Sequence, residues 1–133
     1  MASIYKQVRL DVSAERAWDA LRDFYQVHTR LVPGFVTECR AEAGARVVTF
    51  FNGLVARELF VACDDGVKRV AYSSVGGRAT HHNASAQIFD EGAERCRLVW
   101  ITDVLPDELA GPIGAMMDRG AEVMKATLGA ARG

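Results

Sequence analysis

Long apolar runs, runs of like charge and paired cysteines are all missing from this chain of 133 residues. No apolar stretch approaches the ~20 residues that a membrane-spanning helix needs, so we expect no membrane insertion. Lys and Arg are mixed with Asp and Glu along the chain, and the formal net charge is −1. The absence of a basic cluster argues against nucleic acid as a partner.

Cysteine spacing and the first residues point to one cellular compartment. Cys39, Cys63 and Cys96 are isolated and show no C-x-x-C spacing, as expected for reduced thiols. The opening residues, MASIYKQVRLDVSAE, are interrupted by Lys6 and Arg9 and lack the apolar core of a secretory signal. We therefore expect a cytoplasmic protein.

What is present suits a folded domain. The hydrophobic fraction is 50%, which is enough for one core, and residues 1–133 have the length of a single domain. The patterning predicts a strand over 4–12, two short helices within 13–31, and a long helix over 107–130. Between them it predicts six strands, over 35–42, 46–51, 55–63, 68–75, 80–90 and 95–103.

Short turns such as Asn52-Gly53 and Gly76-Gly77 separate these strands, so neighbouring strands are expected to pair in antiparallel order. The predicted fold class is therefore α+β. We expect a helix-grip fold, in which a seven-stranded curved antiparallel sheet surrounds a long C-terminal helix, with two short helices between strands 1 and 2.

A curved sheet and a straight helix cannot match along their whole length. Small residues are expected at the gap between them, at Ala56, Ala84, Ala86 and Gly120. Gly120 costs about 1 kcal/mol relative to Ala inside a helix. Its presence therefore indicates that the helix must leave space at this position. The alternative is that these residues permit close packing of the helix on the sheet.

The order of the predicted elements and the amino-acid sequences of several segments resemble the START/Bet v1-like (SRPBCC) superfamily, in particular its bacterial polyketide cyclase/dehydratase-like proteins. The resemblance covers nearly the whole chain. It rests on the final amphipathic helix and on GARVVTFFNG, RELFVACDDGVKRVAYSSVGG, THHNASAQIF and LVWITDVLPDELAG. It implies a pocket between the concave sheet and the last helix, with its mouth near Asn52-Gly53 and Gly76-Gly77.

Alternation decides which residues of 80–88 face that pocket. His81, Asn83, Ser85 and Gln87 are all polar, so the other set, which contains His82, is expected to face inward. For the remaining strands the resemblance implies the inward set, including Ile101. Glu58 inward rests on the resemblance, because the opposite set of that strand is equally apolar. The expected ligand-binding residues are Thr37, Val48, Phe50, Glu58, Phe60, Tyr72, Ser74, His82, Ala84, Ala86, Val99, Ile113, Met116, Met117, Gly120 and Met124.

If Val99 faces inward, Trp100 should lie on the opposite face of the sheet. It would then pack under the N-terminal helices or form a homodimer contact. The sequence leaves both possibilities open.

Glu58, His82 and Tyr72 would form a polar cluster in an otherwise apolar pocket. A buried carboxylate is costly unless it is paired or protonated, and an unperturbed histidine titrates near ~6.5. Such a set could enolise or dehydrate a polyketide-like substrate. In the simpler interpretation, Glu58 pairs at the rim with Arg46, Arg57 or Arg78.

Three hypotheses follow for function. The leading one is binding of a small hydrophobic molecule: a lipid, a polyketide-like compound or an aromatic. The enzyme alternative is a cyclase, aromatase or dehydratase, and it requires the three polar groups to lie within hydrogen-bond reach. A protein-interaction module would instead show a filled cavity and an exposed apolar patch. We expect no cofactor and no metal, because phosphate and dinucleotide motifs are absent and His81 and His82 point to opposite faces.

Overall fold

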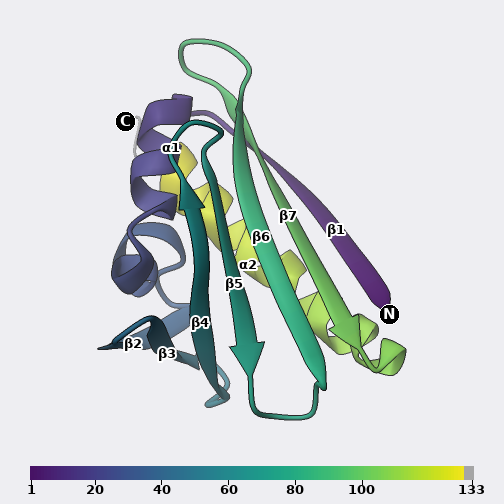
Figure 1. Cartoon of the computed structure of the whole chain (residues 1–133). Coiled ribbons are helices and arrows are strands. Elements are labelled where there is room, and N and C mark those ends of the chain that lie inside the picture. The colour runs from purple at the N-terminus through teal and green to yellow at the C-terminus, as the bar shows by residue number, and fades with distance from the viewer. Residues whose placement is uncertain (131–133) are drawn as a thin grey trace.

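The computed structural model describes residues 1–130 and contains one antiparallel sheet with helices on its concave face (Figure 1). Within these residues seven strands follow the order β1-β7-β6-β5-β4-β3-β2 across the sheet. The strands are β1 (Ala2–Leu10), β2 (Val36–Glu42), β3 (Ala45–Phe50), β4 (Val55–Asp64), β5 (Arg69–Val75), β6 (His81–Asp90) and β7 (Cys96–Leu105). The helix-grip α+β fold predicted from the sequence is confirmed.

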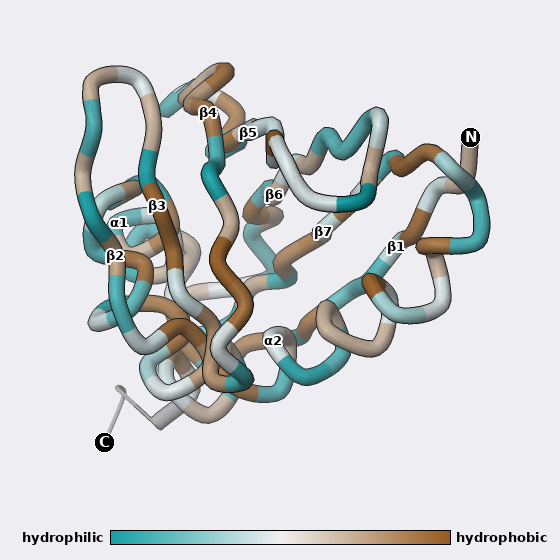
Figure 2. The backbone as a smooth tube through the Cα atoms, turned by 90° about the horizontal axis from the view of Figure 1, so that it is seen from below, coloured by the Kyte–Doolittle hydropathy of each residue, from teal (hydrophilic) through white to brown (hydrophobic). Residues whose placement is uncertain are grey.

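The sheet is an antiparallel meander of β2 to β7, and β1 is added at its edge next to β7. Each strand from β2 to β6 pairs with the next strand along the chain, whereas β1 pairs with β7. At the β5–β6 turn, Gly76 and Gly77 have φ values of 81° and 72°, which a residue with a side chain rarely adopts. In Figure 2 the sheet curves over one long helix, α2 (Ala110–Ala130).

The segment between β1 and β2 forms short helical elements, as the sequence predicted. Helix α1 (Ala14–Leu21) begins at Ser13, whose hydroxyl accepts a 3.2 Å hydrogen bond from the Arg16 amide. A short 3₁₀ turn, η1 (Phe24–Gln26), and one π-helical turn, η2 (Val27–Leu31), follow it. Their buried side chains close one side of the space beneath the sheet.

The last helix starts later than the expected residue 107. A 3₁₀ turn, η3 (Asp107–Leu109), comes first, and α2 then begins at Ala110. Pro112 lies in the first turn of α2, where its missing amide hydrogen has no intrahelical acceptor to lose. No helix in the described residues is long and apolar enough to cross a membrane.

Several of the most deeply buried side chains lie near the end of the sheet where β1 pairs with β7. Leu10, Leu98 and Cys96 are each 0% exposed, and Leu128 of α2 belongs to the same apolar cluster. Burial raises the pKa of the Cys96 thiol to about 11. Cys96 is therefore a protonated core residue rather than a reactive thiol.

Candidate functional site

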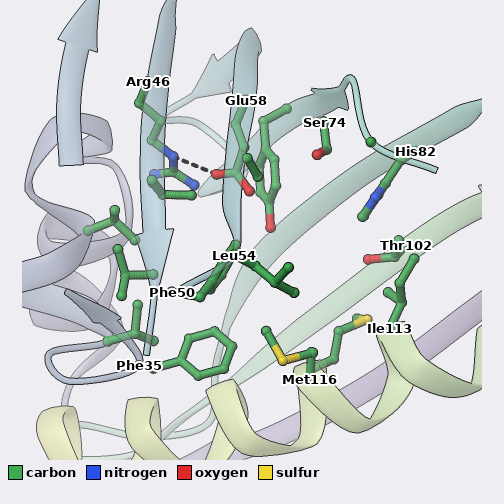
Figure 3. A pocket seen from close by; sticks show the side chains of 18 of the residues that line it. Phe35, Arg46, Phe50, Leu54, Glu58, Ser74, His82, Thr102, Ile113 and Met116 are labelled. Carbon is green, nitrogen blue, oxygen red and sulfur yellow. Dashed lines mark hydrogen bonds and ion pairs between the residues drawn. The ribbon is translucent and has the colours of Figure 1, made fainter. Parts of the chain in front are cut away.

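A cavity of about 390 Å³ lies between the concave face of the sheet and α2. Figure 3 shows side chains from the strands, from the segment before β2 and from α2 converging on this space. Its apolar lining includes Phe35, Phe50, Leu54, Ile113 and Met116. Ligand pockets typically range from ~300 to 1,000 Å³, so the cavity has the volume for a small guest.

Most of the side chains expected in the pocket line this cavity. They come from strands β3, β4, β5 and β6 and from one face of helix α2. The shared set is Val48, Phe50, Glu58, Tyr72, Ser74, His82, Ala86, Ile113, Met116, Met117 and Met124.

Strand β7 has the opposite orientation from the one expected. Ala86 is paired with Trp100 and Ala84 with Thr102, and directly paired residues share a face. Trp100 and Thr102 therefore line the cavity, whereas Val99 and Ile101 belong to the other face and do not. The run is apolar at 98–101, so alternation could not decide between its two faces.

Strand β2 differs from the expectation by one residue. Its pairing with β3 is irregular between Val36 and Glu38, and such a bulge changes which side chains point inward. Val36 is buried and lines the cavity. Thr37 is exposed, and its hydroxyl donates a 3.2 Å hydrogen bond to the Thr49 carbonyl.

Three other expected residues lie outside the cavity. Phe60 is 42% exposed and contacts Phe24 edge to face, with 5.3 Å between ring centroids. Ala84 is buried on the inner face without reaching the cavity wall. At Gly120, an added Cβ would lie 3.1 Å from Phe35 and 3.2 Å from Trp100. Close packing, rather than open volume, therefore explains Gly120.

The carboxylate of Glu58 is held by a buried arginine. Arg46 Nε donates a 2.8 Å hydrogen bond to Glu58 Oε1, and the two side chains are 8% and 11% exposed. A second guanidinium nitrogen of Arg46 donates to the Phe24 carbonyl at 2.8 Å. The guanidinium also lies 3.9 Å from the centroid of the Phe24 ring. Arg46 is thus one of the three partners considered for Glu58, but the pair is interior rather than at the rim (Figure 3).

Arg46 is a cavity residue that the expected set lacked. It shares its strand face with Val48 and Phe50, both of which were expected inward, so the alternation of β3 contained the signal. The other unexpected lining residues on η1, η2 and the turns, among them Phe24, Leu54 and Arg78, lie where no strand period applies.

Tyr72 and His82 have separate environments in the same cavity. The Trp100 indole nitrogen donates a 3.1 Å hydrogen bond to the Tyr72 hydroxyl, which leaves the phenolic hydrogen free to donate elsewhere. Burial raises the pKa of Tyr72, and the Glu58 charge acts in the same direction. Burial lowers the pKa of His82, while Glu58 opposes that change.

Within residues 1–130, no hydrogen bond joins any two of Glu58, Tyr72 and His82. The three share a cavity and sense each other's charge, but they do not form a bonded cluster. The same part of the chain contains no group of three His, Cys, Asp or Glu side chains placed to hold a metal ion.

A family model described as polyketide cyclase / dehydrase and lipid transport matches residues 1–131. No curated protein matches the sequence. Among solved structures, the protein XoxI from Bacillus cereus is 14% identical, with a TM-score of 0.86 and coverage of 96% of each chain.

Two further structures belong to proteins with stated roles or families. A START superfamily protein from Mycobacterium smegmatis is 16% identical, with a TM-score of 0.67, covering 90% of this chain and 94% of its own. Norcoclaurine synthase from Thalictrum flavum, in complex with dopamine and hydroxybenzaldehyde, is 18% identical. Its TM-score is 0.63, and the match covers 91% of this chain and 84% of that one. At these identities the structures show a shared fold.

Proposed function

The chain belongs to the polyketide cyclase/dehydrase and lipid transport family, and from that membership we propose that its cavity binds a small hydrophobic molecule. The observation that carries this proposal is the cavity of about 390 Å³ with a mainly apolar lining. Water in such a space has few hydrogen-bond partners. An apolar guest that displaces this water gains the free energy of apolar burial.

A few polar groups interrupt the apolar wall and would orient the guest. The Ser74 and Thr102 side chains reach the cavity, as do Tyr72 and His82. The Tyr72 hydroxyl already accepts from Trp100, so its own hydrogen is available to a carbonyl or hydroxyl of the ligand. Small numbers of fixed polar groups in an apolar pocket are typical of ligand sites.

Binding is favoured over catalysis by the environment of Glu58. The enzyme hypothesis assigns proton transfer to Glu58, yet that carboxylate bonds Arg46 and no hydrogen bond within residues 1–130 links it to Tyr72 or His82. A carboxylate that is engaged by Arg46 and, in the described part of the chain, not hydrogen-bonded to Tyr72 or His82 does not have the geometry that the enzyme hypothesis requires. The interaction-module hypothesis requires a filled interior, and the cavity volume does not support it.

The test compares a residue of the cavity wall with a residue of the exposed surface. Ile113 lines the cavity from α2, whereas Val61 of β4 is 54% exposed and is not part of the lining. We expect the unmodified protein to bind the neutral apolar dye Nile red with increased fluorescence. Ile113→Trp should lose most of that signal, because the indole occupies the cavity, and Val61→Trp should retain it.

Thermal denaturation of both variants separates a filled cavity from a failure to fold. Native mass spectrometry of the protein purified from its own host adds an independent readout, since a bound apolar compound would appear as added mass. A protein that carries no compound and fails to bind Nile red would contradict the proposal.

A further inference from the structure

The charged side chains that line the cavity are few. Among the described lining residues, Glu58 is the one carboxylate, and the cations are Arg46 and Arg78, with His82 as a titratable neighbour. Those charged side chains that have no partner within the protein indicate whether the site favours a cationic, an anionic or a neutral ligand.

The interior charges cancel each other. Arg46 and Glu58 form a direct ion pair at 2.8 Å and are both buried. Burial lowers the pKa of His82, so this imidazole is mainly neutral near neutral pH. An ionised group of a ligand would find no free opposite charge in this part of the cavity, and its desolvation there would be unfavourable.

Arg78 lies at the mouth and has a different environment. It follows Gly76 and Gly77 in the β5–β6 turn, is exposed, and contributes to the cavity lining. Within the described residues, its side chain forms no ion pair or hydrogen bond, whereas Arg46 pairs with Glu58 and donates to the Phe24 carbonyl. The mouth thus presents an arginine whose five donors are free.

Apolar side chains surround the same mouth. Leu54, Val55 and Val75 line the cavity and are 59%, 63% and 37% exposed. Arg119 of α2 lies 3.9 Å from the centroid of the Phe51 ring on the adjacent β3–β4 turn, which adds a second positive charge near this edge. A molecule that fills the cavity therefore passes from an apolar interior to a positively charged rim.

We propose that the ligand is a monoanionic amphiphile, with its apolar body in the cavity and a carboxylate at the mouth bound by Arg78. This inference rests on the proposed binding function and narrows its ligand class. The planar guanidinium matches a carboxylate through two parallel hydrogen bonds. Because Arg78 is exposed, the interaction contributes modestly to affinity and weakens as salt concentration rises.

The test uses two probes that have the same ring system and differ in charge, naphthaleneacetate and naphthaleneacetamide. Isothermal titration calorimetry at low salt should show the carboxylate binding about fivefold more tightly than the amide, the scale expected for one exposed ion pair. Higher salt should reduce the preference by screening.

Three variants assign the preference to one residue. Arg78→Ala should lose most of the preference for the carboxylate, and Arg78→Lys should retain more of it because its charge remains. Arg69→Ala is the matched control: Arg69 is exposed at the other end of β5 and does not line the cavity. It should keep the full preference.

Three results of these titrations would contradict the inference or the function on which it rests. Equal binding of both probes by the unmodified protein would overturn the anionic ligand class and leave the proposed binding function intact. An undiminished preference in Arg78→Ala would overturn the assignment to Arg78. Failure of both probes and of Nile red to bind would remove the binding function together with this inference.

Discussion

The two halves of α2 contact the sheet in different ways. Around Gly120 and Leu128 the helix lies directly on its neighbours: the Gly120 Cβ position is 3.2 Å from Trp100, and Leu128 belongs to the buried cluster. Around Ile113 and Met116 the side chains are half-buried and face the cavity. We call these the packed half and the open half.

The comparison shows where a curved sheet leaves space under a straight helix. A bulky Trp100 opposite a glycine brings helix and sheet together at one place, and the strand ends bearing Ser74 and His82 lie above the open half (Figure 3). The core residues beside the packed half, Leu10 and Leu98, are apolar, whereas the open half faces several polar groups. The polar groups of the cavity therefore face the open half, whereas Met124 of the packed half contributes an apolar side chain to the same cavity.

The largest expected effect comes from the ion pair that borders the open half. Arg46→Met leaves the buried Glu58 carboxylate without its partner, and we expect a loss of about 3–5 kcal/mol in the free energy of unfolding. Urea denaturation measures it. The matched control is Arg57→Met, which breaks the exposed pair between Arg57 and Glu42 at 2.9 Å and should cost about 0–1 kcal/mol.

Equal costs for the two arginine variants would show that solvent reaches the Arg46–Glu58 pair freely. The open half would then be a hydrated cleft. Contacts beside it would contribute no more to the free energy of unfolding than contacts on the exposed surface.

A smaller effect is expected at the closest approach of the packed half. Gly120→Leu inserts a side chain against Phe35 and Trp100, and overpacking of this kind costs about 1–3 kcal/mol. Gly111→Leu is the control, because a Cβ there meets nothing within 4 Å. Thermal denaturation should show a lower Tm for the first variant and an unchanged or higher Tm for the second. A tolerated leucine at 120 would remove the distinction between the halves.

The smallest effect concerns pH and the open half. Burial lowers the pKa of His82 below its ordinary value of 6.5, so the unfolded chain binds a proton there more readily than the folded chain. Stability should therefore fall as pH drops below about 6.5 and level off below the folded-state pKa. His82→Gln should reduce this fall between pH 7 and 5.

The neighbouring His81, which is exposed, supplies the control for the pH experiment. His81→Gln should keep most of the slope of the unmodified protein, because burial is the largest cause of the lowered pKa of His82 and the His81 charge is the smallest. If His82→Gln also keeps it, the imidazole of His82 is solvated in the folded state and the open half extends further toward solvent than the structure indicates.

Much of the fold followed from local patterns. Turn glycines such as Gly76-Gly77 placed the strand ends, and the polar set of 81–87 fixed the inward face of β6, including His82. Alternation worked there because one face was polar throughout. It did not work for 98–101, where both faces are apolar, and Val99 was placed inward in error for that reason.

Other parts of the site depend on contacts between distant segments. The bulge at Val36 arises from the pairing of β2 with β3, and the partner of Glu58 could be named only as one of three arginines. Gly120 shows the same limit: its sequence context is compatible with open space and with close contact, and the position of Trp100 decides between them.

By itself, the amino-acid sequence determined the order of the elements, the antiparallel meander and the family, because periodicity and turn residues act over a few positions. Only the tertiary structure decided which face β7 turns inward, that Arg46 neutralises Glu58, and where along α2 the cavity lies. These depend on strand register and on the distance between helix and sheet, which are set by packing across the whole molecule.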